Sequence, residues 1–202
     1  MMVNYTMPKT GLTSEEIKEK ALQIAEEKIR YYGFEKFRLT DIAKELKVSH
    51  AALYNHFPDK AALLDAISER WLNRMDYTLE LITKKETSPR QLIIEWFLKY
   101  HELKKEKVLN DPELFKSFNM AAELLKPFIL QHLYNLNEQL LALVQKAIAA
   151  GEIYGESPEK IVQLLLEATV SFHHPRMVLD HKDEQRDVLL QKLVDVLLGG
   201  LA

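Results

Sequence analysis

Residues 49–57 carry side chains whose types and spacing suit the reading of base edges in DNA. As a short helix, this stretch would turn small or hydrogen-bonding groups outward: His50, Ala51, Tyr54 and Asn55, with Ala52 at the margin. An asparagine amide can form two hydrogen bonds with adenine, and an alanine methyl can contact the methyl of thymine. We therefore expect this helix to enter a DNA major groove.

A second helix and a tight turn must hold that helix in place. The segment RLTDIAKELKVSHAALYNHFPDKAALL, residues 38–64, has one inward apolar face that continues across both helices: Ile42, Ala43, Leu46, Val48 and Leu53. Such a pair forms a helix-turn-helix, in which the first helix crosses the DNA backbone and orients the second. Ser49 is a natural N-cap for the second helix. The alternative is a helical hairpin that is simply buried in a core.

The segment resembles the DNA-binding signature of TetR-type (tetracycline-repressor-like) transcriptional regulators. The resemblance lies in the order and spacing of six pieces: Ile42-Ala43, Val48-Ser49, Leu53-Tyr54, His56-Phe57, Lys60 and Leu63. It covers roughly residues 14 to 70. As one combined pattern it is highly specific, although any single piece is not.

This resemblance implies which side chains contact DNA. Tyr54, His56 and Lys60 would face phosphates, whereas the outward residues of the second helix would face bases. The full set of expected DNA-contacting residues is Arg38, Thr40, Ser49, His50, Ala51, Ala52, Tyr54, Asn55, His56 and Lys60.

Two positions depart from the family pattern. Arg38 stands where the family has a threonine that caps the helix and contacts a phosphate, so either Arg38 holds the phosphate by charge or the cap passes to Thr40. Lys47 stands in the turn, where the family favours glycine. A non-glycine residue in a left-handed conformation costs on the order of 1 kcal/mol.

The composition limits the classes of protein. The 202 residues include no cysteine, which excludes disulfides and thiolate chemistry. No apolar run is long enough to span a membrane, and residues 1–16 lack the apolar core of a signal peptide, so we expect a cytoplasmic protein. The net charge is −3, and residues 1–60 are only marginally basic. We expect DNA affinity to depend on a few well-placed donors and on dimerisation.

The apolar spacing predicts an all-α protein of about nine helices. Thr13 and Glu16 form a capping box for the first helix, and Gly33 ends it. Helices after the first three are expected near residues 60–84, 89–107, 112–124, 127–150, 158–173 and 184–199. The resemblance implies a three-helix DNA-binding head over residues 1–58 and a larger ligand-binding and dimerisation domain over residues 59–202.

The last two helices are too apolar for the surface of a monomer. In residues 187–201 the polar side chains Gln191, Lys192 and Asp195 occupy one arc of about 100°, and most of the rest is Leu or Val. A helix of this kind needs neighbours on two sides. We expect the second neighbour to be another copy of the chain in a two-fold homodimer, as the family dimerises; a pair buried within a monomer is the alternative.

Aromatic residues crowd the middle of the chain, where the family encloses a cavity for a small inducer. The expected pocket residues are Trp96, Tyr100, His101, Phe115, Phe118, Phe128, Phe172 and His173. Such side chains suit a mostly apolar ligand, although aromatics at helical spacing also simply form cores. We expect no cofactor and no metal site, because the adjacent His173 and His174 point about 100° apart on a helix.

Three functions compete for this sequence. The first is a repressor that binds a palindromic operator in double-stranded DNA and is released by a small, largely apolar inducer. The second is a helix-turn-helix regulator without an inducer, controlled by a protein partner or by its abundance. The third, a helical enzyme, is disfavoured because the chain has no Glu-x-x-His pair, no His-Glu-x-x-His and no Gly-x-Ser-x-Gly motif. We therefore expect no enzymatic activity.

Overall fold

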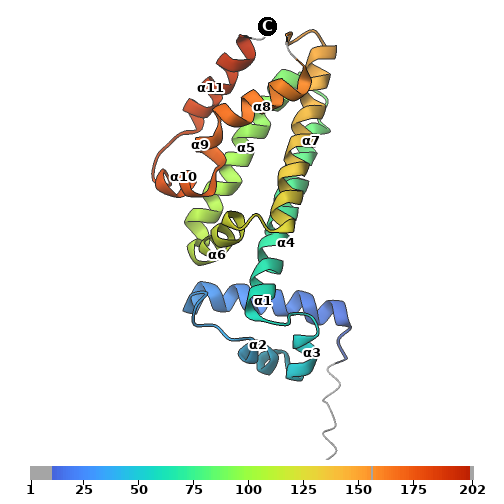
Figure 1. Cartoon of the computed structure of the whole chain (residues 1–202), viewed down its shortest axis with the longest axis vertical. Coiled ribbons are helices and arrows are strands. Elements are labelled where there is room, and N and C mark those ends of the chain that lie inside the picture. The colour runs from blue at the N-terminus through green and yellow to red at the C-terminus, as the bar shows by residue number, and fades with distance from the viewer. Residues whose placement is uncertain (1–10, 156, 201–202) are drawn as a thin grey trace, which may run out of the picture. The chain divides into compact units, whose positions relative to one another are not determined.

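The computed structural model describes residues 11–155 and 157–200, and every helix or strand assigned within them is an α-helix (Figure 1). The helices are α1 (Ser14–Tyr32), α2 (Leu39–Leu46), α3 (His50–Tyr54), α4 (Lys60–Thr83), α5 (Pro89–Asn110), α6 (Pro112–Glu123), α7 (Pro127–Ala149), α8 (Pro158–Ala168), α9 (Val170–His173), α10 (Pro175–Asp180) and α11 (Asp187–Gly199). The predicted all-α class is confirmed.

The first of two compact units runs to Arg70 and includes Glu113–Met120 of α6. Its core joins α1, α2, α3 and the beginning of α4, and it includes Ala21, Ala25, Ile29, Ile42, Ala43, Leu53, Phe57, Leu63 and Ile67. Arg70 also ties α4 to α1, because its guanidinium lies 2.9 Å from Glu19 and 2.7 Å from Glu26. The capping box of Thr13 and Glu16 begins α1 as predicted.

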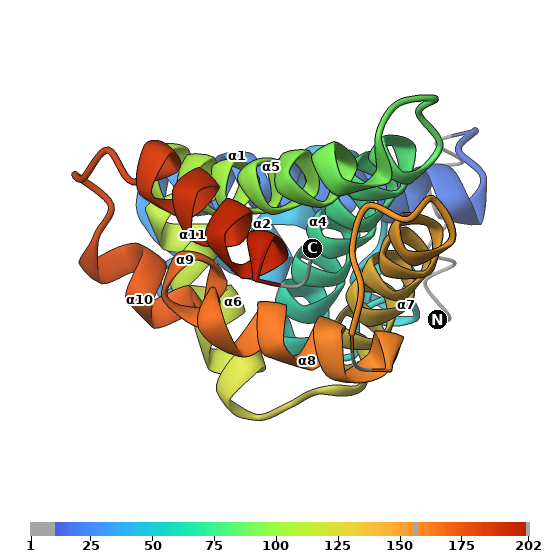
Figure 2. The ribbon, with the colours of Figure 1, turned by 90° about the horizontal axis from the view of Figure 1, so that it is seen from above.

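The second unit comprises Trp71–Pro112 and the chain from Ala121 onward. Its core contains Met75, Leu79, Trp96, Phe97, Tyr100, Leu140, Leu143, Leu165, Leu190 and Val194. Helix α5 packs against α7 and α11, and α8 packs against α7, an arrangement that Figure 2 shows from above. The predicted domain boundary after residue 58 lies in the loop before α4 and stays a prediction.

The segment between residues 158 and 187 differs from the prediction. The single helix expected over 158–173 is broken into α8 and α9 at Thr169, whose hydroxyl donates to the carbonyl of Leu165 at 2.7 Å. A threonine that bonds back to the residue four positions earlier bends helices. The stretch between the helices expected at 158–173 and 184–199 contains a further helix, α10, which begins at Pro175. The described residues therefore form eleven helices instead of about nine.

None of the helices in the described ranges combines the length and apolar character that a membrane crossing needs.

Candidate nucleic-acid interface and polar core

Helix α3 is short and is fixed at both ends. The hydroxyl of Ser49 accepts a hydrogen bond from the backbone N–H of Ala52 at 3.1 Å, so the predicted N-cap is confirmed. Leu53 is fully buried and anchors the inner face. These two residues determine which side of α3 faces outward.

The outer face of α3 carries the side chains expected to face bases. His50, Ala51, Tyr54 and Asn55 are exposed, and Ala52 is half-buried. The rings of His50 and Tyr54 lie nearly parallel with centroids 6.4 Å apart, and 42 % of Tyr54 remains exposed. The face is therefore accessible and carries side chains that are either small or able to form hydrogen bonds, as the reading of base edges requires.

The turn between α2 and α3 is built on Lys47. This residue has φ 55° and ψ 34°, and its backbone N–H ends α2 by bonding to carbonyls of Ala43 and Lys44. The prediction of a non-glycine residue in the left-handed region is confirmed. The conformation costs on the order of 1 kcal/mol relative to glycine.

The start of α2 shows which of Arg38 and Thr40 occupies the N-cap position. Arg38 is the N-cap residue in an extended conformation, with no capping hydrogen bond from its side chain. Thr40 lies inside α2, one residue after its start at Leu39, so the suggestion that Thr40 takes over the cap is wrong. Arg38 is exposed, and its phosphate contact stays a prediction.

The two remaining phosphate candidates are held by contacts within the fold. The ammonium of Lys60 donates to the carbonyl of Glu35 at 2.8 Å and lies 4.7 Å from the centre of the Phe37 ring, and burial lowers the pKa of Lys60. His56 Nε2 lies 3.3 Å from the Ser14 hydroxyl. A lysine ammonium has three donors, so the bond to Glu35 is compatible with a phosphate contact.

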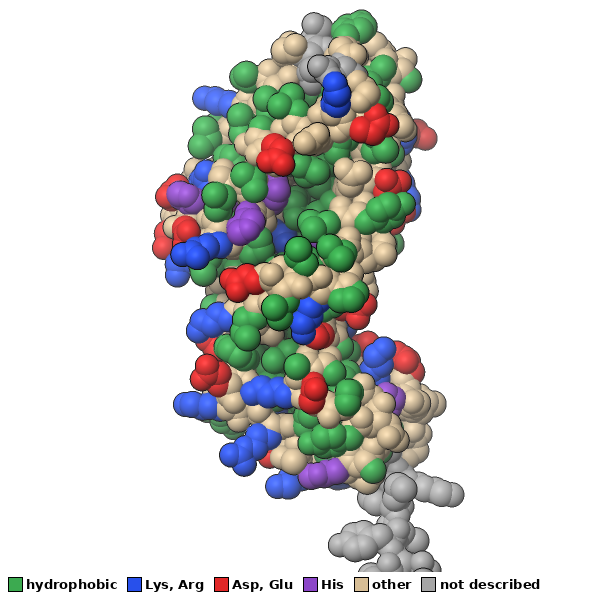
Figure 3. Space-filling view, viewed as in Figure 1, with side chains coloured by type: hydrophobic (Ala, Val, Ile, Leu, Met, Phe, Trp, Pro, Cys, Tyr) green, Lys and Arg blue, Asp and Glu red, His purple; other side chains and the backbone are tan. Residues whose placement is uncertain are grey.

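The surface of the first unit carries no continuous basic patch on the side drawn in Figure 3. There, blue and red side chains are interspersed over the region of α1, α2 and α3. This distribution agrees with the expectation that DNA affinity depends on a few donors.

Two family models match the chain. Residues 22–67 match the model of bacterial regulatory proteins of the tetR family, and residues 89–194 match the tetracyclin repressor-like C-terminal domain. The chain belongs to the TetR family. Proteins of this family bind DNA to regulate transcription, form dimers and often bind small molecules.

Individual relatives agree with this membership. The chain is 32 % identical over 136 residues to the nucleoid occlusion factor SlmA of Shewanella sediminis, a match that covers 55 % of this chain and 68 % of that protein. A TetR/AcrR-family regulator from Thermobifida fusca has a TM-score of 0.71 at 20 % identity, over 92 % of this chain and 98 % of that one. The regulator FadR of Bacillus subtilis, solved in complex with stearoyl-CoA, has a TM-score of 0.65 at 16 % identity, over 91 % and 99 %.

The structure brings together five of the residues expected to line the ligand pocket of this TetR-family chain. In the second unit, the Tyr100 ring lies 5.3 Å from those of Trp96 and His173, measured between centroids. His101 Nδ1 lies 2.7 Å from the Phe172 carbonyl.

The other three expected pocket residues lie elsewhere. Phe128 is half-buried at the beginning of α7. Phe115 and Phe118 belong to the first unit, where their ring centroids are 5.7 Å apart. Ligand contact by any of the eight stays a prediction.

Sequence reasoning missed a buried polar network beside these aromatic rings. The Asp76 carboxylate lies 2.5 Å from His132 Nδ1 and accepts a hydrogen bond from the Asn135 amide at 2.7 Å. The Gln139 amide donates to the Asp76 carbonyl at 2.9 Å and accepts from the Trp96 indole at 3.0 Å. The network joins α4, α5 and α7.

Lys104 lies in the same region and is almost completely buried. Its ammonium lies 5.2 Å from the centre of the Trp71 ring and 5.3 Å from that of Tyr100. Burial lowers the pKa of Lys104 to about 7, although the charge of Asp76 opposes this shift. Burial also lowers the pKa of His132, and it lowers that of His173 to about 4.

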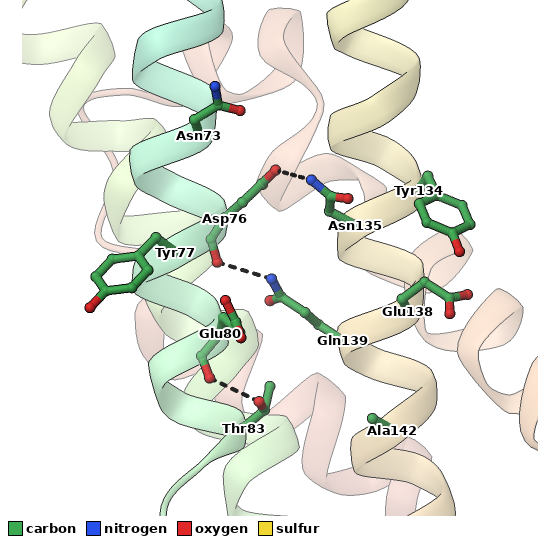
Figure 4. Close-up of a pocket in the computed structure, with 10 residues that line it drawn as sticks. All are labelled: Asn73, Asp76, Tyr77, Glu80, Thr83, Tyr134, Asn135, Glu138, Gln139 and Ala142. Carbon is green, nitrogen blue, oxygen red and sulfur yellow. Dashed lines mark hydrogen bonds between the residues drawn. The ribbon is translucent and has the colours of Figure 1, made fainter.

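An open groove of about 500 Å³ runs along the seam of α4 and α7 (Figure 4). Asp76, Asn135 and Gln139 point toward one another across the seam, and Tyr77 and Tyr134 extend outward on either side of it. The groove has a mixed polar and apolar lining, and it contains none of the eight residues expected to line the ligand pocket.

Proposed function

We propose that this protein is a ligand-responsive transcriptional repressor, released from a palindromic operator by a small molecule. The observation that carries the DNA-binding part is the outer face of α3, which is exposed, carries side chains that are either small or able to form hydrogen bonds, and is fixed by the Ser49 cap and by buried Leu53. Phosphate contacts from Arg38, Tyr54, His56 and Lys60 would set the register of this helix on the duplex.

The apolar outer surface of α11 supports dimerisation. Leu190, Val194 and Leu198 are buried within the chain. On the adjoining side, Leu189 is 56 % and Val196 71 % exposed. A second copy would cover this side in a two-fold four-helix interface with α8. Such a dimer would place two α3 helices in successive major grooves about 34–36 Å apart.

Regulation by a ligand rests on the second unit and on two shared helices. Both α4 and α6 contribute residues to both units, so a shift of either helix in the second unit reaches the first. A ligand can drive that shift only through different affinities for the two arrangements. The FadR structure contains stearoyl-CoA, which supports a ligand for the second unit of this chain also.

The DNA-binding part is tested by changing one small residue on α3. Ala51→Glu places a carboxylate on the exposed face, where it repels phosphates, so operator affinity should fall at least about tenfold, equivalent to ~1.4 kcal/mol. The matched control is Ala149→Glu, the same change at an exposed position of α7. Equal operator affinity of the two variants in a fluorescence-anisotropy titration would show that α3 does not contact the DNA.

One observation favours a regulator controlled by a protein partner. Large apolar side chains are exposed around the α6–α7 connection: Leu124, Leu125, Leu130 and Leu133. Exposed apolar clusters often mark protein contacts. If no small molecule changes operator affinity while a Leu130→Glu, Leu133→Glu variant loses regulation in cells, this second function replaces the first.

A further inference from the structure

Lys104 is a charged residue in the apolar centre of the second unit, with 2 % of its surface exposed. Its ammonium lies near the Trp71 and Tyr100 rings, whose faces attract a cation. Burying an ammonium is nevertheless unfavourable for folding. Groups with strongly shifted pKa values are often found at functional sites, so a role in binding would explain why a charge lies here.

His132 provides a second nitrogen in the same region. Because the Asp76 carboxylate can only accept, the short contact assigns the proton of neutral His132 to Nδ1. Nε2 then carries a lone pair, and it is buried with no hydrogen-bond partner among the described residues. Nearly all buried polar atoms have a partner, so a ligand is a reasonable occupant of this position.

Tyr100 lies between these groups. Its ring centroid is 6.2 Å from that of His132, 5.3 Å from that of His173 and 5.3 Å from the Lys104 ammonium. Burial raises the pKa of Tyr100, so its hydroxyl remains a neutral hydrogen-bond donor. Figure 3 shows the face of this unit hollowed between apolar side chains, with histidine at the edge of the hollow.

The geometry points to a small organic acid, bound as its carboxylate by Lys104 and His132, as the ligand of the second unit; this inference rests on the proposed function. One carboxylate oxygen would accept a hydrogen bond from the Lys104 ammonium. The other would accept from His132 Nε2, which must take up a proton on binding because a carboxylate only accepts. The Trp71, Trp96 and Tyr100 rings would contact the apolar part of the ligand. An alcohol, an amide or an amine brings no negative charge, so its binding would not draw a proton onto Lys104 or His132 Nε2.

Proton uptake on binding is a second readout, and it follows from the charges of the site. Asp76 and protonated Lys104 balance each other, so a bound carboxylate adds one uncompensated negative charge. That charge favours a proton on Lys104 or on His132 Nε2. Binding should therefore take up as much as one proton near pH 7.5, whereas binding by packing alone would leave protonation unchanged.

The test is isothermal titration calorimetry of the full chain at pH 7.5, repeated in two buffers with different ionisation enthalpies. The probes are benzoate, butyrate and octanoate, each compared with its amide, together with octylamine. At least one carboxylate should bind ten or more times as tightly as its amide and with proton uptake. Lys104→Met should reduce that preference at least tenfold and reduce the uptake.

Two further variants make the result specific. Lys99→Met makes the same change on the same helix, where the side chain is partly exposed and paired with Glu102, and should leave binding unchanged. His132→Phe should weaken the carboxylates and reduce the proton uptake, because it removes Nε2 as a proton acceptor. Circular dichroism checks that each variant is folded, and Lys104→Met is expected to be folded because it removes a buried charge.

Amides or octylamine that bind as tightly as carboxylates would overturn the inference, and so would the absence of binding by every probe. An amide or amine that releases operator DNA would leave the proposed repressor intact while excluding an acid. Carboxylates that bind through Lys104 without changing DNA affinity would support the acid site and contradict the repressor mechanism.

Discussion

Some residues of the DNA-binding head form contacts within the fold, whereas others are exposed and available to contact DNA. The Lys60 ammonium is bonded to Glu35, and His56 lies against Ser14. Tyr54 and Asn55 are exposed. Substitution of Lys60 would therefore perturb the fold together with its proposed phosphate contact, whereas substitution of Tyr54 would test the proposed DNA contact alone.

Tyr54→Ala should lower operator affinity by about 1–3 kcal/mol without changing the dimer. The reason is that a hydrogen bond to a charged group contributes about this much. Tyr54→Phe keeps the ring and removes only the hydroxyl, so a similar loss in this variant would assign the contact to the hydroxyl. The measurement is a gel-shift titration at constant salt, and wild-type affinity for Tyr54→Ala would contradict the assignment.

Lys104→Met should raise the free energy of unfolding near pH 7, because it removes a charge that burial disfavours. The pKa of Lys104 is about 7 in the fold and about 10.4 in an unfolded chain. Between these values the unfolded state binds more protons, so the lysine protein gains stability as pH rises from 7 to 10. Urea denaturation at pH 7, 8.5 and 10 should therefore show a shrinking advantage for the Lys104→Met variant, and a constant difference would contradict it.

The sequence allowed the exposed face of α3 to be predicted residue by residue, but it did not reveal the polar network. Lys104 follows Tyr100 by four positions and Trp96 by eight, so it shares one face of the helix with them. A lysine at such a position is usually taken for a solvated side chain. Its burial depends on Trp71, which approaches from another helix, and sequence spacing within one helix cannot show this.

Helical elements were predictable where a local signal marks their ends. Ser49 caps α3 as predicted, and Ser88 and Ser157 cap α5 and α8 in the same way, each by accepting from a backbone N–H three residues later. The break at Thr169 was missed because the apolar pattern continues across it. The helix breaks there because the Thr169 hydroxyl donates to the carbonyl of Leu165. The presence of a threonine does not by itself determine whether this hydrogen bond forms.

The left-handed conformation of Lys47 in the turn between α2 and α3 predicts that glycine at this position would stabilise the fold. Lys47→Gly should raise the free energy of unfolding by as much as ~1 kcal/mol, because glycine adopts the φ of 55° without strain. Lys47→Ala removes the same charge but keeps the β-carbon, so it should bring no such gain. Urea denaturation measures both variants, and equal stability of the two would show that backbone strain is absent.

We propose that the whole molecule acts as a dimer and that the exposed apolar side of α11 forms its interface. Leu189→Glu with Val196→Glu should convert the dimer into monomers, because burying two carboxylates in an apolar interface is strongly unfavourable. Gln191→Glu adds a carboxylate on the polar side of α11 and should leave the dimer intact. Sedimentation velocity measures the outcome, and a double variant that remains a dimer would show that this surface is not the dimer interface.

A dimeric regulator that reads DNA through α3 should select one class of sequence from a pool of random DNA duplexes, and fluorescence-anisotropy titration at several salt concentrations would then measure its affinity. We expect enrichment of a palindrome whose half-sites are one helical turn apart, with affinity that falls steeply as salt rises. Weak binding without any enriched sequence would contradict a dimeric regulator that reads DNA through α3.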